Sequence, residues 1–275
     1  MLGVVDLGED SDRSIPELMS LRGRVAVVTG GARGTGSAIA RRLAEAGAAV
    51  VIGDADQVAA EATADELRRP ARAVTGMHLA VAAEADVSAF ADRVVDEHGS
   101  IDVWVNNAGI YPHAPVLDMT AAEWDEVVDF NLKGAFLGAR EAARRMTATD
   151  GGGVIVNIAS TAAFRASAPG VAHYVASKFG VRGLTQALAI ELGPVGIRVL
   201  GVAATFTVTP GTRARRADLD DAAYRAYVER VGAHKPLRRV AVPDDVARVV
   251  LFCASDMSSL MTGSTLVVDA GDLAG

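Results

Sequence analysis

Cysteine, aromatic residues and long apolar runs are scarce in this 275-residue sequence. Cys253 is the only cysteine, which excludes an intrachain disulfide and a cysteine-based zinc site, and we expect no metal site. Because Cys253 directly follows the apolar run Val249–Phe252, we interpret it as a small buried residue and not as a reactive thiol.

The sequence also lacks the marks of a membrane or exported protein. No run of roughly 18 apolar residues occurs, and the acidic start of the chain does not resemble a signal peptide. The formal net charge is −7, whereas a nucleic-acid or anionic-membrane partner would favour a basic surface. We therefore expect a cytoplasmic protein that binds neither nucleic acid nor membrane.

What the sequence does contain is a regular alternation of apolar runs and helical segments. Hydrophobic residues make up 50% of the chain, enough for a sizeable core. Near-continuous apolar strands separated by helices predict a parallel sheet that is covered on both faces. The expected class is α/β, with one doubly wound, Rossmann-type domain at residues 21–275 after a flexible tail at residues 1–20. The expected strands are residues 25–28, 48–52, 73–79, 103–105, 154–158, 198–203 and 265–268.

A glycine-rich turn follows the first expected strand. The residues from Thr29 to Gly36 read Thr-Gly-Gly-Ala-Arg-Gly-Thr-Gly and lead into a helix expected at residues 36–46. Glycines let the backbone approach a pyrophosphate, and the helix N-terminus supplies free N–H groups. The spacing is Gly-x-x-x-Gly-x-Gly instead of Gly-x-Gly-x-x-Gly, and a purely structural turn is the alternative.

Asp54, at the end of the second expected strand, bears on which dinucleotide binds. A carboxylate there accepts hydrogen bonds from the adenosine ribose and repels a 2′-phosphate. Arg33 argues the other way, because a guanidinium pairs with that phosphate. We expect NAD, with NADP as the less favoured cofactor.

Tyr174 and Lys178 stand four residues apart at the start of an expected helix that runs to about Leu192. This spacing places both side chains on one helical face. A nearby ammonium and the positive ring of an oxidised nicotinamide stabilise a phenolate, and lowering a tyrosine pKa from about 10 to about 7 requires roughly 4 kcal/mol. Such a pair also occurs as ordinary decoration of a surface helix.

Taken together, Thr29–Gly36, Asn106-Asn107-Ala108-Gly109, Ser160 and Tyr174/Lys178 resemble the classical short-chain dehydrogenase/reductase family over residues 21 to 271. The resemblance implies that Tyr174 is the general acid/base, that Lys178 lowers its pKa and binds the nicotinamide ribose, and that Ser160 holds the substrate oxygen. Asn131 fits the asparagine that anchors a water in the proton relay. Thr161, next to Ser160, is the alternative to Ser160. The implied cofactor contacts are Gly30, Arg33, Gly34, Thr35, Gly36, Asp54, Val81, Asn106, Ala108, Gly109, Tyr174, Lys178 and Thr207.

The sequence departs from the family pattern at several positions. Ala80 stands where an aspartate usually binds the adenine amino group, which leaves a backbone group of Val81 for that contact. Ala204 and Thr205 replace the usual Pro-Gly beside the nicotinamide, and Leu200 replaces an asparagine. Losing the adenine hydrogen bond is expected to weaken cofactor binding by about 1 kcal/mol.

The family resemblance also implies a lid over the substrate at residues 206–238 and a homotetramer. We interpret the arginines and acids at residues 213–221 as a solvated helix face, with an anion-binding role as the alternative. The expected pocket wall comprises Tyr111, Phe164, His173 and Phe206, which suits a cyclic or aromatic substrate.

Three functions are compatible with these patterns. The first is an NAD-dependent oxidoreductase that transfers a hydride between the cofactor and an alcohol or carbonyl of a small molecule. The second is an epimerase, dehydratase or cyclisation catalyst on the same fold, which would leave the cofactor without net change. The third is a non-catalytic binding protein, for which Tyr174→Phe would have no effect.

Overall fold

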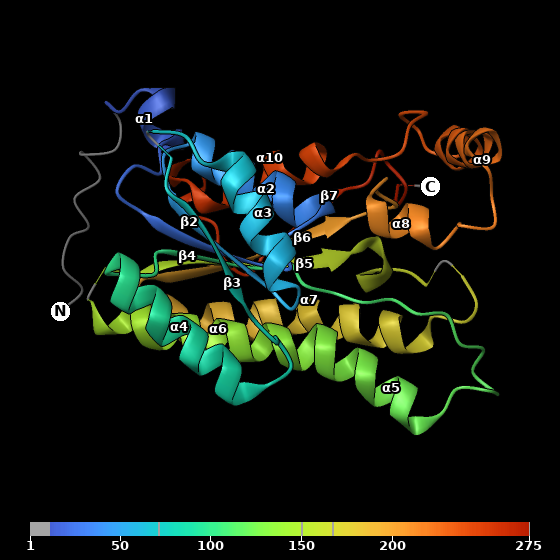
Figure 1. Cartoon of the computed structure of the whole chain (residues 1–275), viewed down its shortest axis with the longest axis horizontal. Coiled ribbons are helices and arrows are strands. Elements are labelled where there is room, and N and C mark those ends of the chain that lie inside the picture. The colour runs from blue at the N-terminus through green and yellow to red at the C-terminus, as the bar shows by residue number, and fades with distance from the viewer. Residues whose placement is uncertain (1–11, 71, 150, 167, 275) are drawn as a thin grey trace.

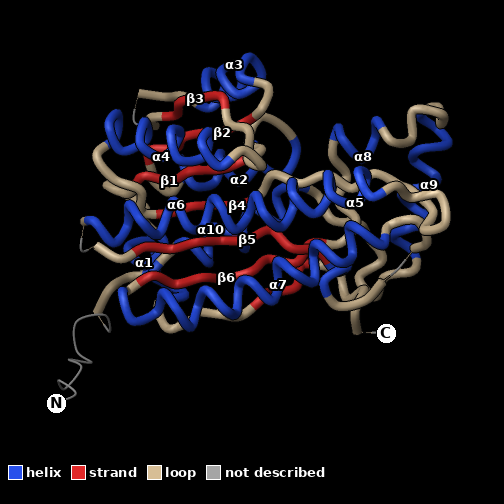
Figure 2. Tube along the Cα trace, turned by 90° about the horizontal axis from the view of Figure 1, so that it is seen from below, coloured by secondary structure: helices blue, strands red, loops and turns tan. Residues whose placement is uncertain are grey.

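The computed structural model describes residues 12–70, 72–149, 151–166 and 168–274. Its centre is a parallel sheet of seven strands in the order β3-β2-β1-β4-β5-β6-β7, which lie side by side in Figure 2. The doubly wound α/β fold expected from the alternating pattern is thereby confirmed. The strands are β1 (Val25–Thr29), β2 (Ala49–Asp54), β3 (Val74–His78), β4 (Val103–Asn106), β5 (Gly153–Ser160), β6 (Ile197–Ala204) and β7 (Thr265–Val268).

Helices cover both faces of the sheet (Figure 1). One face carries α2 (Gly34–Glu45), α3 (Gln57–Leu67) and α10 (Pro243–Ala254). The other carries α4 (Glu84–His98), α6 (Gly134–Ala148) and α7 (Ala172–Leu192). Each layer has its own apolar core, because the buried strand residues alternate between the two faces. Trp104 of β4 is fully buried in the second core, edge to face with Phe90 of α4.

The order of the strands determines where a site can form. The chain runs outward from β1 to β2 and β3, and then crosses back to β4 on the other side of β1. The connections that follow β1 and β4 therefore lead toward opposite edges of the sheet, and open sheets of this type bind ligands at that switch point. Residues of the glycine turn, of Asn106–Gly109 and of the segments after β5 and β6 all lie at this edge.

The N-terminal segment differs from the expected flexible tail where the structure describes it. Residues 1–11 of that segment lie outside the described residues. Beyond them, α1 (Ile15–Met19) is a short helix with a capping box between Ser14 and Glu17. Arg13 also forms an ion pair with Asp256 at 2.8 Å, which attaches this segment to the domain.

The remaining helices surround the switch-point edge. α5 (Ala121–Val128) leads through a π-helical turn at Asp129–Lys133 into α6. The expected lid segment contains α8 (Pro210–Ala214) and α9 (Asp221–Ala233), which stand apart from the sheet layers in Figure 2.

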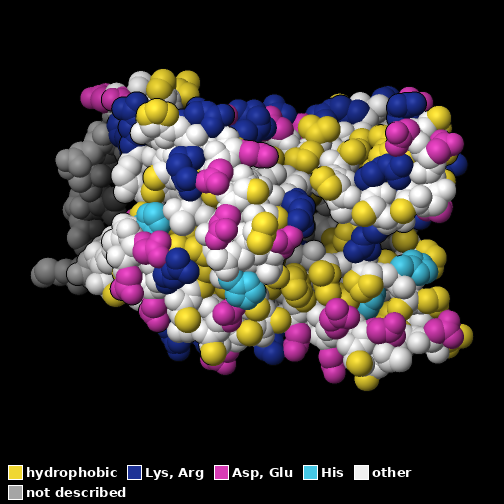
Figure 3. Space-filling view, viewed as in Figure 1, with side chains coloured by type: hydrophobic (Ala, Val, Ile, Leu, Met, Phe, Trp, Pro, Cys, Tyr) yellow, Lys and Arg dark blue, Asp and Glu magenta, His cyan; other side chains and the backbone are white. Residues whose placement is uncertain are grey.

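Cys253 is fully buried on α10, and burial raises the pKa of its thiol to about 12, which confirms its interpretation as an inert core residue. The face in Figure 3 carries acidic and basic side chains together. Among the helices of the described ranges, none has both the length and the apolar character to cross a bilayer.

Candidate active site

The glycine turn after β1 is packed too closely for a side chain at Gly30 or Gly36. Gly30 has φ of +60°, and a Cβ there would lie 2.8 Å from the Cα of Ala108. A Cβ on Gly36 would collide with the carbonyl oxygen of Gly30. The turn therefore leaves bare backbone at the N-terminus of α2, which fits the pyrophosphate of a dinucleotide.

Asn107 fastens this turn to the end of β4. Its side-chain amide donates to the carbonyl oxygens of Thr29 and Gly30 at 2.9 and 3.0 Å, and its backbone N–H donates to the Thr29 hydroxyl at 3.0 Å. Asn106, expected as a cofactor contact, lies behind the turn. Its side chain is buried and bonds Asn157 on β5 and the Ala135 carbonyl, so it braces the sheet and does not line either cavity described below.

A cavity of about 150 Å³ opens beside the turn at the ends of β1, β2 and β3. It brings together Asp54, Ala80, Val81 and Ala108, as expected for an adenosine pocket. The Asp54 carboxylate accepts hydrogen bonds from the backbone N–H groups of Ala32 and Asp56, both at 3.1 Å. Asp54 thus braces the glycine turn and also faces the cavity.

The surroundings of Ala80 and Arg33 bear on how the adenine and the ribose of a cofactor would be bound. The Asp86 carboxylate accepts the backbone N–H of Ala80 at 2.5 Å, so a carboxylate approaches this position from α4. The Arg33 guanidinium pairs with Asp56 at 2.5 Å. This pairing competes with any contact between Arg33 and a ribose phosphate.

A second cavity of about 460 Å³ continues from the glycine turn to the ends of β5 and β6. Ser160, Tyr174 and Lys178 line it together with Thr35, Thr207 and Gly109. Thr161, the alternative to Ser160, also lines the cavity. The Ser160 side chain lowers the pKa of Tyr174, whereas no such effect of Thr161 is found among the described residues.

Burial shifts the pKa values of Tyr174 and Lys178, both on α7, in the direction that favours the neutral form. Burial raises the pKa of Tyr174, and the Ser160 side chain offsets part of that rise. Burial lowers the pKa of Lys178 to about 8, and its Nζ donates to the carbonyl oxygen of Ile158 at 2.9 Å. That Lys178 and a bound oxidised nicotinamide together lower the pKa of Tyr174 stays a prediction.

Asn131 occupies the π-helical turn between α5 and α6. Its side chain exchanges two hydrogen bonds with the backbone of Ile110, both at 2.8 Å, and donates to the Ser177 hydroxyl at 3.1 Å. A Cβ on Gly109 would lie 3.4 Å from Asn131 Oδ1 and 3.6 Å from Lys178 Nζ. Asn131 thus joins the loop after β4 to α7 directly beside Lys178.

Two of the four residues that were expected in the pocket wall line the cavity. Tyr111 and Phe206 line the cavity, with their neighbour Tyr227 of α9. Phe164 packs instead on Ala159, Ala163 and other small residues and lies under the Arg182 guanidinium at 4.1 Å, so it does not narrow the cavity. His173 is fully buried and is not part of the cavity lining.

A buried network behind Thr205 was missed from the sequence. Nζ of Lys235 donates to the Thr205 hydroxyl at 2.8 Å, and this hydroxyl donates to Asp272 at 3.0 Å. Thr205 also lines the second cavity, the one that Ser160, Tyr174 and Lys178 line. These contacts hold the turn where the family pattern has Pro-Gly. The one sign of them in the sequence was Lys235 itself, because the chain has only three lysines.

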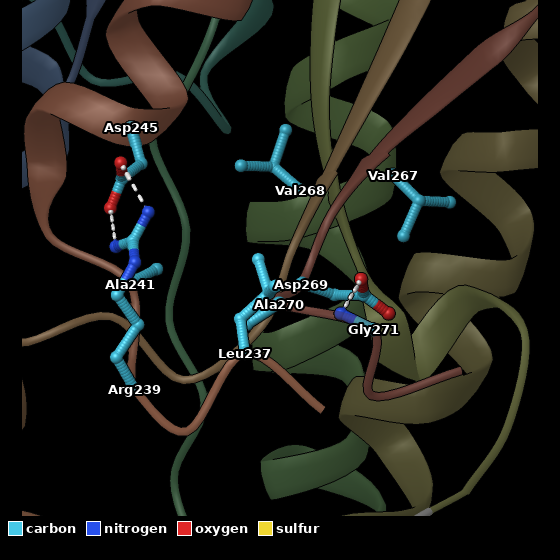
Figure 4. A pocket seen from close by; sticks show the side chains of 9 residues that line it. All are labelled: Leu237, Arg239, Ala241, Asp245, Val267, Val268, Asp269, Ala270 and Gly271. Atoms are coloured by element: carbon cyan, nitrogen blue, oxygen red, sulfur yellow. Dashed lines mark hydrogen bonds and ion pairs between the residues drawn. The ribbon is translucent and has the colours of Figure 1, made fainter. Parts of the chain in front are cut away.

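A further hollow of about 320 Å³ lies between the end of β7 and the start of α10 (Figure 4). Arg239 and Asp245 pair there with both oxygens of the carboxylate, and Asp269 accepts the backbone N–H of Gly271. Its polar side chains are thus occupied with one another. In the described ranges no group of three or more histidines, cysteines or carboxylates is placed to hold a metal ion.

Comparisons with known proteins agree with this geometry. A family model described as "Enoyl-(Acyl carrier protein) reductase" matches residues 30–272. The chain is 40% identical to D-threitol dehydrogenase of Mycolicibacterium smegmatis, covering 91% of this chain and 93% of that protein. It is 41% identical to cis-4-hydroxycyclohexanecarboxylate dehydrogenase of Sinomonas cyclohexanicum, covering 90% and 96%. The crystal structure of a putative NAD(P)-dependent gluconate 5-dehydrogenase from Beutenbergia cavernae, with NADP bound at low occupancy, is 36% identical, with a TM-score of 0.85 and coverage of 94% and 100%.

Proposed function

The chain belongs to the short-chain dehydrogenase/reductase family of NAD(P)-dependent oxidoreductases, and on that premise we propose that it interconverts a cyclic secondary alcohol and its ketone with NAD(H). The observation that carries the proposal is that Ser160, Tyr174 and Lys178 line one cavity, in which the Ser160 side chain lowers the pKa of Tyr174. An acid/base and a second hydrogen-bond donor thus meet where one substrate oxygen fits.

The proposed mechanism assigns one task to each side chain. When bound, NAD(P) supplies the hydride acceptor or donor for the substrate carbon. Tyr174 removes the hydroxyl proton during oxidation and returns it during reduction, while Ser160 donates a hydrogen bond to the same oxygen. Lys178, as an ammonium, stabilises the phenolate that accepts the proton during oxidation and that forms when Tyr174 donates the proton during reduction. Asn131 positions Lys178 by holding the loop after β4 against α7.

The preference for NAD rests on Asp54 and on the pairing of Arg33. Asp54 faces the adenosine cavity, and its charge disfavours a 2′-phosphate there. Arg33, the cation that would offset this charge, is engaged with Asp56. The fit of the cofactor itself is supported by the bare backbone at Gly30 and Gly36.

The substrate class follows from the cavity wall and from the relatives. Tyr111, Phe206 and Tyr227 supply flat aromatic faces, and α8 and α9 of the lid segment stand over them. One of the similar dehydrogenases is named for a hydroxylated cyclohexane. A ring of about that size fits the 460 Å³ cavity together with a nicotinamide.

We further propose a homotetramer. Large apolar side chains are exposed on α6 and α7, namely Phe136, Phe179 and Ile190, with exposed fractions of 40%, 44% and 80%. A second apolar patch, at Leu260 and Val267, lies near the C-terminus. Exposed apolar groups on two separate faces suit two interfaces. Sedimentation at the mass of one chain, 28.4 kDa, would overturn this proposal.

The experiment for the proposed function is an absorbance assay of reduced nicotinamide with a panel of cyclic alcohols. Formation of NADH with at least one ring alcohol, and slower formation of NADPH, is the expected result. A chain that binds the cofactor but converts a substrate without any net change in its absorbance would instead act as an epimerase or dehydratase.

A further inference from the structure

We propose that Arg215 binds a carboxylate of the substrate at the mouth of the catalytic cavity, so that the preferred substrate is an anionic ring alcohol. This inference rests on the proposed function, because it names the substrate class of the same cavity. It assigns a specificity role to one arginine of a charged segment that the sequence patterns describe as a solvated helix face.

Arg215 follows α8 and lies against the cavity wall. The centre of its guanidinium group is 3.4 Å from the centroid of the Tyr111 ring, and its Nη1 donates to the Tyr111 carbonyl oxygen. The Tyr111 ring is in turn 5.5 Å from the ring of Tyr174. The guanidinium is therefore at most about 9 Å from the acid/base ring, which is within the reach of a single ring-shaped substrate.

Several of the other charged side chains of this segment have partners elsewhere in it or on α9. Arg213 pairs with Asp221 at 3.1 Å and stacks on Tyr224. Asp220 accepts the backbone N–H of Ala223 and caps α9. In the parts of the chain that the structure describes, no carboxylate lies within ion-pair distance of Arg215.

The cavity itself also lacks negative charge. Its lining contains no aspartate or glutamate, and Lys178 is its titratable cation. Arg215 acts electrostatically on the two neighbouring phenols, because its charge lowers the pKa of Tyr111 and of Tyr174 against the effect of burial. A substrate carboxylate at Arg215 would supply the missing counter-charge in a protein that is otherwise strongly acidic.

The geometry of the stack favours a carboxylate over other ligands. With one face of the guanidinium on Tyr111 and its Nη1 on the Tyr111 carbonyl oxygen, the Nε and Nη2 edge remains, and its two N–H groups match the two oxygens of a carboxylate. A neutral ring alcohol makes no such contact. Charge-assisted hydrogen bonds at a partly exposed site are expected to favour the anion by about tenfold in affinity.

The test is calorimetric and needs no turnover. Cyclohexanecarboxylate and cyclohexanecarboxamide are titrated into the full chain, with and without saturating NADH. The carboxylate is expected to bind about tenfold more tightly than the amide, and Arg215→Met is expected to abolish the difference. Arg215→Lys, which keeps the charge but not the pair of parallel N–H donors, is expected to retain part of the difference in affinity. Arg225→Met is the matched control, because Arg225 is exposed on α9 of the same segment and, among the described residues, stacks on no ring of the cavity wall.

Two results would overturn the inference: equal affinity for the acid and the amide, or an unchanged preference in Arg215→Met. Failure of the proposed function is distinguishable from either result. If no ring alcohol is oxidised but the carboxylate preference holds and depends on Arg215, the oxidoreductase proposal falls and the anion site stands.

Discussion

Nζ of Lys235 lies 2.9 Å from Oδ2 of Asp272, which joins the end of the lid segment to the C-terminal segment. Lys235 is 5% exposed, and both groups contact the hydroxyl of Thr205 at the wall of the catalytic cavity. Burial alone would raise the pKa of Asp272, but Lys235 and Thr205 hold it below its usual value. The ion pair therefore fixes the turn after β6 by charge, where the family pattern uses Pro-Gly.

Asp272→Asn is expected to weaken this turn. Removing one partner leaves the Lys235 ammonium buried without a counter-charge, and we expect the free energy of unfolding to fall by about 2 kcal/mol. The KM for the substrate should rise several-fold, because the turn at Thr205 loses the ion pair that holds it. Urea unfolding and steady-state kinetics measure both effects. Asp221→Asn, which breaks an exposed ion pair in the same region, serves as the control and should change stability by less than about 0.5 kcal/mol. Equal stabilities of the two variants would contradict this role.

Lys178→Met is expected to abolish activity and yet stabilise the protein near pH 7. The folded-state pKa of Lys178 is about 8, below the unfolded value of 10.5, so protonated Lys178 destabilises the fold at neutral pH. Allowing for the lost bond to Ile158, the gain should be about 2 kcal/mol.

The stability gain of Lys178→Met depends on pH, over a range that the folded and unfolded pKa values of Lys178 define. Between about pH 8 and pH 10.5 the unfolded chain binds more protons than the folded one, so the wild type gains stability as the pH rises and the advantage of the variant disappears. Urea midpoints at pH 7 and above pH 10.5 measure this change. Lys133→Met, at an exposed lysine, should show no such window. A variant that is less stable than the wild type at pH 7 would refute the argument.

Asp54→Asn is expected to move the cofactor preference toward NADP by about tenfold. The amide keeps an acceptor for the backbone of the glycine turn but removes the charge that repels a 2′-phosphate. The ratio of Kd values for NADH and NADPH, from fluorescence titrations, is the measurement. Asp65→Asn, an exposed position on α3, is the control. An unchanged ratio of Kd values would mean that Asp54 braces the turn but does not discriminate between NADH and NADPH.

Much of the architecture could be predicted because it depends on local patterns. Apolar runs such as Val25–Val28 and Val154–Ile158 are buried strands within one or two residues of their expected bounds. The helix that carries Tyr174 likewise ends at Leu192, as expected. Periodicity and glycine spacing are properties of neighbouring residues, so the sequence displays them directly.

The contacts that were missed join residues far apart in the chain. Nothing near Lys235 or Asp272 indicates that they meet at Thr205, and nothing near Arg215 indicates that it stacks on Tyr111. The direction of a side chain is equally hidden, which is why Phe164 was expected in the cavity although it packs beside Val181. Desolvation of Tyr174 and Lys178 also depends on the assembled fold.

The measurement that tests the central claim most directly is a comparison of Tyr174→Phe with the wild type on one ring alcohol. The variant keeps the ring against Tyr111 but has no proton to exchange. We predict that NADH formation falls by at least about a thousandfold, while the Kd for NADH, followed by energy transfer from Trp104 and Trp124, changes less than about threefold. Retained turnover in a variant that still binds NADH would contradict the assignment of Tyr174 as the acid/base.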